Sequence, residues 1–336
     1  MEPSSRTPSA PPAGLVSIEE IRAAAGRIEG VVVRTPLLRY PMRELLVKPE
    51  SLQPTGSFKV RGASAAIAAL PDEQRRRGVI AHSSGNHAQA VAYAAAAAGV
   101  PAVVVVPHNA QAVKVDSARA LGAEVVTVEP TLAARVAGTE ELAARHGYAV
   151  IPPFDDRRVI AGQGTIGLEI AADCDTAGMA PDVVLVPVSG GGLISGVATA
   201  IKAANPGATV IGVEPELAAD ARDSLRAGEP VGWPAGDTGR TIADALRVER
   251  VGELPLAHMR AHVDEIVTVT EDEIRAAIPR VAHDLRLIAE PGGVVAVAAY
   301  LFRLAELPRA RTYVAVLSGG NIAPALLAEL LAVLPG

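Results

Sequence analysis

Residues 183–204 read VVLVPVSGGGLISGVATAIKAA. The first part, Val183–Val188, is a continuous apolar run, which is typical of a strand covered on both faces. Ser189 and three consecutive glycines follow, and the small and apolar residues from Leu193 onward predict a helix. A strand that enters a glycine loop and then a helix indicates an open α/β sheet, whose ligands bind at the carboxyl ends of the strands. The backbone N–H groups of such a loop favour a phosphate, and a flexible turn is the alternative.

The same alternation continues along the chain. Strands are expected at Val79–His82, Ala102–Val106, Glu124–Val128, Val183–Val188, Thr209–Glu214, Glu265–Val269 and Thr312–Leu317. Helices are expected at Gly85–Ala98, Val113–Leu121, Leu132–His146, Leu193–Ala204, Glu271–Leu285 and Val294–Leu307. Strands that alternate with helices predict an α/β fold with parallel sheets and right-handed crossovers.

The composition excludes several classes of function. The chain has 336 residues, 49% of them apolar, and its net charge of −6 offers no basic surface to nucleic acid. Cys174 is the only cysteine, so no intrachain disulfide forms, and its two aspartate neighbours disfavour a thiolate. The apolar run Ala90–Val106 is interrupted by Gly99 and Pro101 and is too short to cross a membrane. We therefore expect a cytoplasmic protein with no nucleic-acid or membrane partner, and a disordered tail at residues 1–13.

Three further stretches place polar residues beside predicted helices. They are AHSSGNH at 81–87, LSGGN at 317–321 and QPTGSFKVRGA at 53–63. In the last, Lys59 lies between Phe58 and Val60. A lysine in apolar surroundings has a lowered pKa because burial disfavours its charge, and a neutral amine can form a Schiff base with a carbonyl compound. The alternatives are a solvated lysine and serines that only cap a helix.

Together the four stretches resemble one family. The motifs TGSFKVRGA, SSGNH, SGGGL and LSGGN occur here in the order found in pyridoxal-phosphate enzymes of the tryptophan-synthase-β fold type, or fold type II. Within that group they are similar to serine/threonine dehydratases and serine racemases. Shorter matching stretches lie at 34–37, 161–165, 241–244 and 269–273, so the resemblance covers about residues 17–330.

The resemblance implies a two-domain α/β fold with parallel or mixed twisted sheets flanked by helices, and with pyridoxal 5′-phosphate in the cleft. Residues 14–77 and 153–336 would form the large cofactor-binding domain, and residues 78–152 a small mobile domain that closes on the substrate. A homodimer is expected on the same basis.

The resemblance also assigns roles to individual residues. Lys59 would bind the cofactor through a Schiff base and remove the α-proton of the substrate, and Phe58 would pack on the cofactor ring. Asn86 would donate a hydrogen bond to the phenolic oxygen of the ring, and Ser318 would face the pyridine nitrogen. The phosphate would be held by backbone N–H groups of Ser189, Gly190, Gly191, Gly192 and Leu193, and the substrate carboxylate by the loop of Ser83, Ser84, Asn86 and His87.

The implied reaction is an α,β-elimination that converts L-threonine or L-serine to 2-oxobutyrate or pyruvate plus ammonia. Serine racemase is the alternative, because Ser84 stands where racemases carry a second acid/base group. The stretches PFDD at 153–156 and ADALRV at 243–248 are more similar to dehydratases. The choice among serine, threonine, 3-hydroxyaspartate and phenylserine stays open.

A cation site is implied at 214–220, which resembles the divalent-metal site of serine racemases. Glu214 and Asp220 would give carboxylate oxygens and Ala218 its carbonyl oxygen, a set of hard ligands that suits Mg²⁺ or Ca²⁺. The alternative is an acidic loop at the end of a strand.

Two other patterns are interpreted as structural. Residues 162–167 spell G-x-G-x-x-G, but no convincing strand precedes them, which argues against an NAD-dependent oxidoreductase. His258 and His262 are four residues apart without a further ligand, so they are expected to be a solvated pair and not a zinc site. A protein that only binds amino acids is another alternative, which the intact lysine and glycine loop oppose.

Overall fold

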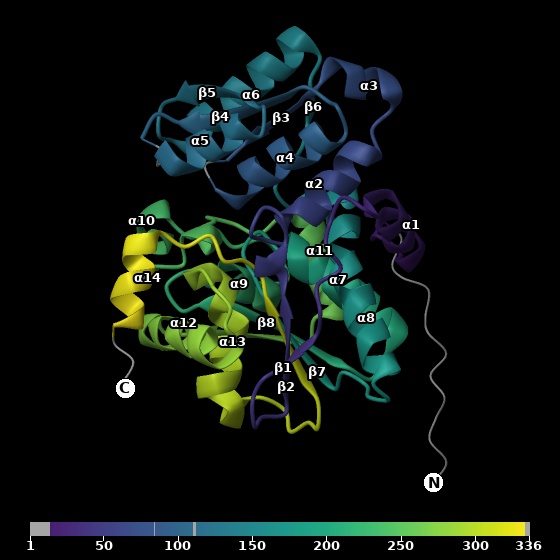
Figure 1. Cartoon of the computed structure of the whole chain (residues 1–336), viewed down its shortest axis with the longest axis vertical. Coiled ribbons are helices and arrows are strands. Elements are labelled where there is room, and N and C mark those ends of the chain that lie inside the picture. Colours follow the sequence, from purple (N-terminus) through teal and green to yellow (C-terminus); the bar gives the residue numbers. More distant parts are fainter. Residues whose placement is uncertain (1–13, 84, 110–111, 333–336) are drawn as a thin grey trace.

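The computed structural model describes residues 14–83, 85–109 and 112–332. The tail expected at 1–13 and the candidate residue Ser84 lie outside this described part. Figure 1 shows two lobes, and each lobe is built around one sheet.

The larger sheet has both faces covered by helices. Its order is β1 (Leu38–Arg39), β2 (Leu45–Pro49), β10 (Tyr313–Leu317), β7 (Val183–Pro187), β8 (Thr209–Pro215) and β9 (Glu265–Val269), and only β1 pairs antiparallel. Val183 and Leu185 pack with α12 (Glu271–Leu285) and α13 (Pro291–Arg303). Val184 and Val186 pack on the opposite face with α7 (Arg157–Thr176) and α8 (Gly192–Ala204). This two-sided burial explains the continuous apolar runs in the sequence.

The smaller sheet is entirely parallel, with the order β5 (Glu124–Val128), β4 (Ala102–Pro107), β3 (Val79–His82) and β6 (Ala149–Val150). Helices α4 (Asn86–Ala97) and α5 (Ala112–Ala120) cover one face, and α6 (Leu132–His146) covers the other. Helix α2 (Lys59–Ala68) packs against both α4 and α7 and so joins the two lobes. Domain boundaries at residues 78 and 152, and closure of the smaller domain, stay predictions.

The other helices are α1 (Ile18–Ile28), α3 (Asp72–Arg77), α9 (Asp220–Ala227), α10 (Ala235–Thr238), α11 (Glu253–His262) and α14 (Pro324–Leu331). Every expected strand and helix is present, with ends that agree to within a few residues. Strand β2 was not expected, because Lys48 and Pro49 interrupt its apolar run. None of the helices in the described ranges combines the length and apolar character that a membrane span needs.

The G-x-G-x-x-G pattern lies in the middle of α7, with no strand directly before it, which confirms that it is not a dinucleotide fingerprint. Its glycines allow helices to approach closely. A Cβ on Gly162 would lie 2.6 Å from the carbonyl oxygen of Arg61 on α2, and a Cβ on Gly167 would lie 2.8 Å from that of Val197 on α8.

The expectation of a solvated histidine pair is wrong for His258, which is fully buried. Its Nε2 accepts a hydrogen bond from the Val16 N–H (3.0 Å), and its Nδ1 lies 3.2 Å from Thr199 Oγ1. Burial lowers the pKa of His258 to about 4, so the ring is neutral near pH 7. The sequence could not indicate this, because the buried partner Val16 is 242 residues away.

Candidate active site

Two of the motif loops run side by side at the carboxyl end of β10. The Phe58 N–H donates to the Ser318 carbonyl oxygen (3.0 Å), and the Gly320 N–H donates to the Gly56 carbonyl oxygen (2.9 Å). These bonds bring Lys59, the first residue of α2, to the edge of the larger sheet where ligands of α/β folds bind. Ser318 itself is buried at this junction.

Lys59 has the properties expected of a reactive amine. Its Nζ donates to the Pro153 carbonyl oxygen (2.8 Å) and lies 5.0 Å from the centre of the Phe58 ring. Burial lowers the pKa of Lys59 from 10.5 to about 8, and the nearby carboxylate of Glu290 opposes that shift. The lowered pKa is in the direction that the sequence analysis expects for a lysine in apolar surroundings, and the assignment of Lys59 as the reactive amine stays a prediction.

The glycine loop between β7 and α8 fits a phosphate. Gly191 has a φ of +89°, which favours glycine, and a Cβ there would lie 2.7 Å from Pro255. A Cβ on Gly190 would overlap the Phe154 ring, and a Cβ on Gly192 would lie 2.9 Å from the Phe154 carbonyl oxygen, so the loop is held in place by its surroundings. The first N–H groups of α8 have no carbonyl partner inside the helix, and the helix dipole favours an anion there. These features are those that the phosphate of pyridoxal phosphate requires.

Asn86 begins α4 and is held at both ends of its amide. Its Nδ2 donates to Glu290 Oε1 (2.6 Å), and its Oδ1 accepts from Asn321 Nδ2 (2.8 Å). Asn321 also donates to the Thr55 carbonyl oxygen (2.8 Å). The side chain expected to contact the cofactor ring is therefore connected directly to Glu290 and, through Asn321, to the loop of Thr55 that precedes Lys59.

The loop expected to bind the substrate carboxylate is described except for Ser84. Ser83 Oγ accepts from the Gly85 N–H (3.1 Å). His87 is buried, and its Nε2 lies 2.8 Å from the Ile151 carbonyl oxygen. Burial and the nearby charge of Lys59 lower the pKa of His87 to about 3. Because the neutral ring must donate through Nε2 to a carbonyl, only the backbone N–H of His87 is left to donate to a carboxylate.

Sequence reasoning missed three contributors to this site: Glu290, Asn321 and the carbonyl group of Pro153. Glu290 is 4% exposed, and it directly precedes Pro291, the first residue of α13. An acidic residue before a proline and two glycines is the signal that could have identified it, since the proline marks the start of a helix and places the acidic residue at its N-terminal end. Asn321 ends the LSGGN motif but was given no role. No pattern marks a backbone carbonyl.

The candidate cation site contains two buried carboxylates. Glu214 ends β8 and accepts from the backbone N–H groups of Ala221 (3.1 Å) and Arg222 (2.8 Å). Neither carboxylate oxygen of Asp220 accepts a hydrogen bond of normal geometry from the described residues. Burial raises the pKa of Asp220 to about 7 and the pKa of Glu214 well above its usual value. Two buried carboxylates, one of them unsatisfied, fit a hard cation, although the described residues contain no group of three such ligand side chains.

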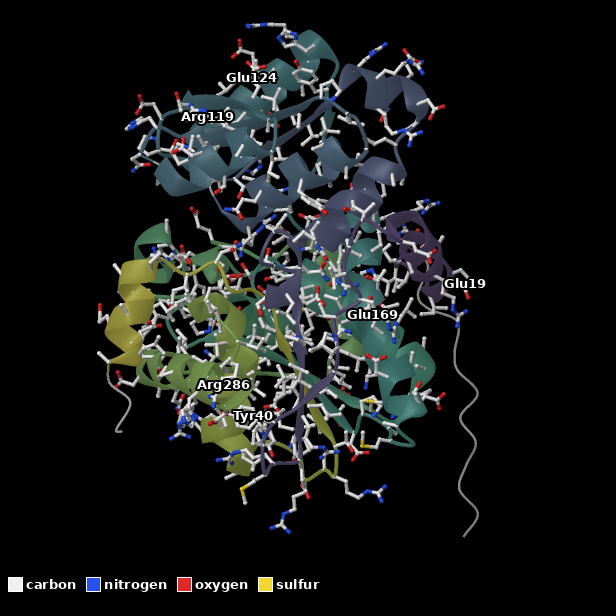
Figure 2. The ribbon with its side chains drawn as sticks, viewed as in Figure 1. Glu19, Tyr40, Arg119, Glu124, Glu169 and Arg286 are labelled. Carbon is white, nitrogen blue, oxygen red and sulfur yellow. The ribbon has the colours of Figure 1, made fainter. Side chains whose placement is uncertain are left out.

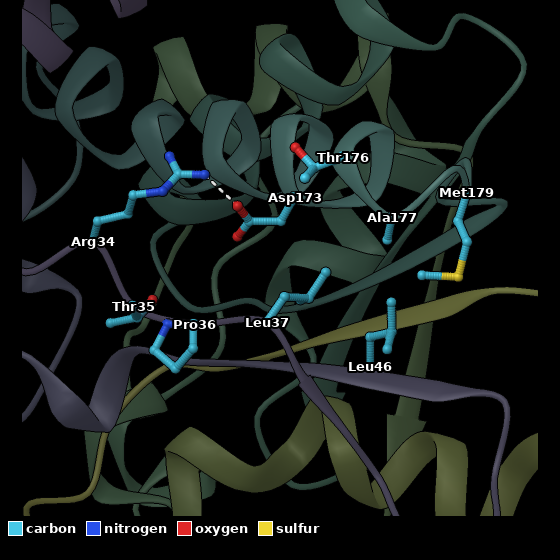
Figure 3. Close-up of a pocket in the computed structure, with 9 residues that line it drawn as sticks. All are labelled: Arg34, Thr35, Pro36, Leu37, Leu46, Asp173, Thr176, Ala177 and Met179. Carbon is cyan, nitrogen blue, oxygen red and sulfur yellow. Dashed lines mark hydrogen bonds and ion pairs between the residues drawn. The ribbon is translucent and has the colours of Figure 1, made fainter.

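A separate cavity of about 340 Å³ lies beside the carboxyl end of α7 (Figure 3). Arg34 and Asp173 form an ion pair across it, and Met179 and Leu46 line its apolar side (Figure 3). None of its lining residues comes from the four motif loops.

Comparisons with known proteins identify the family of the chain. A model of the family described as pyridoxal-phosphate dependent enzyme matches residues 28–319. An L-threonine ammonia-lyase from Thermotoga maritima is 41% identical over 317 residues, which are 92% of this chain and 76% of that protein. A serine racemase from Dictyostelium discoideum is 38% identical, over 93% of this chain and 96% of that protein.

A solved structure gives the same result. The crystal structure of a threonine deaminase from T.th. matches with a TM-score of 0.86 and 44% identity, over 91% of this chain and 99% of that chain. The resemblance read from the four motifs and the α/β fold are therefore confirmed. The chain belongs to the family of pyridoxal-phosphate dependent enzymes.

Proposed function

We propose that this protein is an ammonia-lyase, or dehydratase, that converts L-threonine and L-serine to 2-oxobutyrate and pyruvate by eliminating the β-hydroxyl group. The observation that carries the proposal is the position of Lys59 at the motif loops, where its Nζ donates to the Pro153 carbonyl oxygen and where burial lowers its pKa to about 8 against the effect of the nearby Glu290 carboxylate. The ammonia-lyase, deaminase and racemase relatives support the same class of chemistry.

Each residue of the site has a separate role in the proposed reaction. When bound, pyridoxal phosphate supplies a sink for the electrons left behind when the α-proton departs. Ser189–Leu193 would hold its phosphate, Asn86 its phenolic oxygen and Phe58 one face of its ring. Lys59 would hold its aldehyde carbon and, once displaced by the substrate amine, accept the α-proton at Nζ. The neutral hydroxyl of Ser318 would face the pyridine nitrogen, which favours loss of the β-hydroxyl over transamination.

The test is proton NMR of the cofactor-loaded protein with L-threonine or L-serine in D₂O. We expect 2-oxobutyrate or pyruvate as the main product, and comparison of the two rates ranks the substrates. Lys59→Ala should abolish both turnover and the visible absorbance of the bound cofactor. Full activity in Lys59→Ala would refute the proposal. Loss of the α-proton signal without a 2-oxo acid or D-serine would mean that the natural leaving group is different.

Serine racemase is a second candidate, favoured by the 38% identity to the Dictyostelium discoideum enzyme. Racemisation needs a second proton donor opposite Lys59, and Ser84 is the proposed group. D-serine that forms faster than pyruvate, and disappears in Ser84→Ala, would promote this reading. Formation of pyruvate alone would remove it.

We further propose that Glu214, Asp220 and the carbonyl oxygen of Ala218 bind Mg²⁺ or Ca²⁺. The buried and unsatisfied carboxylate of Asp220 supports the proposal, because such a group is costly without a partner. Addition of either cation to the chelated protein should raise its melting temperature, and Asp220→Asn should remove that response. An equal response in Asp220→Asn would place the cation elsewhere.

The homodimer and the cytoplasmic location expected from the sequence also stay proposals. Light scattering of the purified protein at several concentrations measures its mass in solution. A mass close to the 34.4 kDa of one chain at all concentrations would rule out the dimer.

A further inference from the structure

Three side chains, Asn321, Asn86 and Glu290, form a continuous hydrogen-bonded chain that crosses the site. It begins at the Thr55 carbonyl oxygen and ends at the Glu290 carboxylate. We propose that Glu290 and Asn321 are positioning residues that hold the amide of Asn86 in one orientation, with an N–H directed to the phenolic oxygen of the cofactor. This inference rests on the proposed function, in which Asn86 contacts that oxygen.

The acceptors at the two ends of the chain decide the orientation of every amide between them. A carbonyl oxygen only accepts, so Asn321 must present its nitrogen to Thr55, and the same nitrogen lies 2.8 Å from Asn86. Asn86 therefore presents its oxygen to Asn321 and its nitrogen to Glu290. An ionised carboxylate also only accepts, so the far end of the chain requires the same arrangement. With the Asn86 amide reversed, its nitrogen would face the Asn321 nitrogen, where both groups are donors, and its oxygen would face the Glu290 carboxylate, where both groups are acceptors.

The surroundings of Glu290 hold its carboxylate in place. The side chain is 4% exposed, and its backbone N–H donates to the Gly319 carbonyl oxygen (3.0 Å). A Cβ on Gly319 would overlap Glu290 Oε1, so only glycine leaves room for the carboxylate at this point. Its charge also acts on Lys59, whose pKa it raises against the effect of burial.

The chemistry explains why one orientation matters. An amide nitrogen carries two N–H groups, and Asn86 uses one of them for Glu290. The second is left for an anionic oxygen, and a hydrogen bond to a charged acceptor is among the stronger ones in proteins. A reversed Asn86 would present its own carbonyl oxygen to the phenolic oxygen, which repels instead of binding.

Glu290→Gln tests the inference because the new amide can either accept from or donate to Asn86 and no longer imposes one orientation. We expect the apo-protein to bind pyridoxal phosphate about tenfold more weakly. The pH midpoint of the visible absorbance band, measured without substrate, should move higher, because a hydrogen bond to the phenolic oxygen favours its deprotonated form and the variant weakens that bond; a lower midpoint would show that the lost charge acts directly and not through Asn86. Asn321→Asp cannot donate to Thr55 or Asn86, so it should shift both quantities in the same direction.

The matched control is Glu141→Gln on the exposed face of α6, which makes the same change in net charge and should leave both readouts unchanged. Circular dichroism and thermal melting of each apo-protein report whether it folds. If Glu290→Gln does not fold, the cofactor affinity and pH midpoint of Asn321→Asp are compared with those of the wild-type protein instead.

A double variant separates action through Asn86 from a direct effect of charge. In an Asn86→Ala background, Glu290→Gln should change cofactor affinity by less than about twofold, because coupled residues are not additive. A full tenfold loss in both backgrounds would overturn the inference, as would wild-type affinity and midpoint in both single variants. A wild-type protein that binds no pyridoxal phosphate would instead refute the proposed function itself.

Discussion

At the residue scale, the chemistry of Lys59 depends on what surrounds its amine. The sequence places this lysine between two apolar residues, and the fold adds the Pro153 carbonyl oxygen and the nearby carboxylate of Glu290. Burial removes water from the ammonium form and lowers the pKa from 10.5 to about 8. Near pH 7 this raises the neutral, nucleophilic fraction about 300-fold.

Acetylation of the apo-protein measures that fraction directly. Only a neutral amine reacts with acetic anhydride, so the rate at Lys59 should rise with pH and reach half its maximum near pH 8. Peptide mass spectrometry follows each lysine separately, with the partly exposed Lys202 as an internal reference. A midpoint above pH 10 for Lys59 would show that its amine is solvated.

At the element scale, α7 and α8 pack with almost no space between their backbones. A Cβ on Gly196 of α8 would overlap the Ile160 carbonyl oxygen and the Gly164 backbone nitrogen of α7. The close approach matters for the site, because α8 begins at the glycine loop and its position sets the direction of the loop N–H groups. The glycines that resemble a dinucleotide fingerprint are therefore packing residues.

Gly196→Ala should lower the free energy of unfolding by about 3 kcal/mol or more, since the added methyl group meets rigid backbone. Gly26→Ala on α1 is the matched control: its Cβ meets nothing within 4 Å, and alanine favours a helix by up to about 1 kcal/mol. Urea denaturation at pH 7.5 measures the free energy of unfolding of both variants. Equal stability in the two variants would mean that α7 and α8 can move apart at little cost.

At the scale of the whole molecule, a buried group of charges joins segments that are distant in the sequence. The guanidinium of Arg61 on α2 forms ion pairs of 2.7 Å with Glu50 after β2 and with Glu169 on α7. Lys48 of β2 also forms an ion pair with Glu169 (2.7 Å). Figure 2 labels Glu169. Arg61, Lys48 and Glu50 are fully buried, so their charges depend on one another. Because Arg61 is two residues from Lys59, the same contacts anchor the start of α2.

Arg61→Met should cost about 3–5 kcal/mol of stability, because it leaves two carboxylates without their main partner. Arg145→Met on α6 removes an arginine whose ion pair with Glu141 is exposed, and it should cost less than about 1 kcal/mol. Chemical denaturation compares the two. A cost for Arg61→Met as small as that for Arg145→Met would show that water or neighbouring groups compensate the buried charges.

Much of the fold could be predicted from local patterns. Valine-rich segments identified β3, β4, β5, β7, β8, β9 and β10. Several of them, such as β7, are continuous apolar runs, because a strand covered on both faces needs apolar residues at every position. Strand β2 escaped prediction, since Lys48 looks like a surface residue until Glu169 is placed beside it. The prediction that His258 is solvated was wrong for a similar reason, because its burial depends on Val16, which is 242 residues away in the sequence.

The sequence by itself determined the motif loops and the family and singled out Lys59 as the candidate reactive lysine, because each depends on residue types at short spacing. Only the tertiary structure decided how those loops meet. Glu290 and Asn321 acquire roles because β10, α4 and α13 bring them to Asn86, and their hydrogen bonds join residues more than 200 positions apart. The lowered pKa of Lys59 and the raised pKa of Asp220 are likewise products of burial, which exists only once the chain has folded.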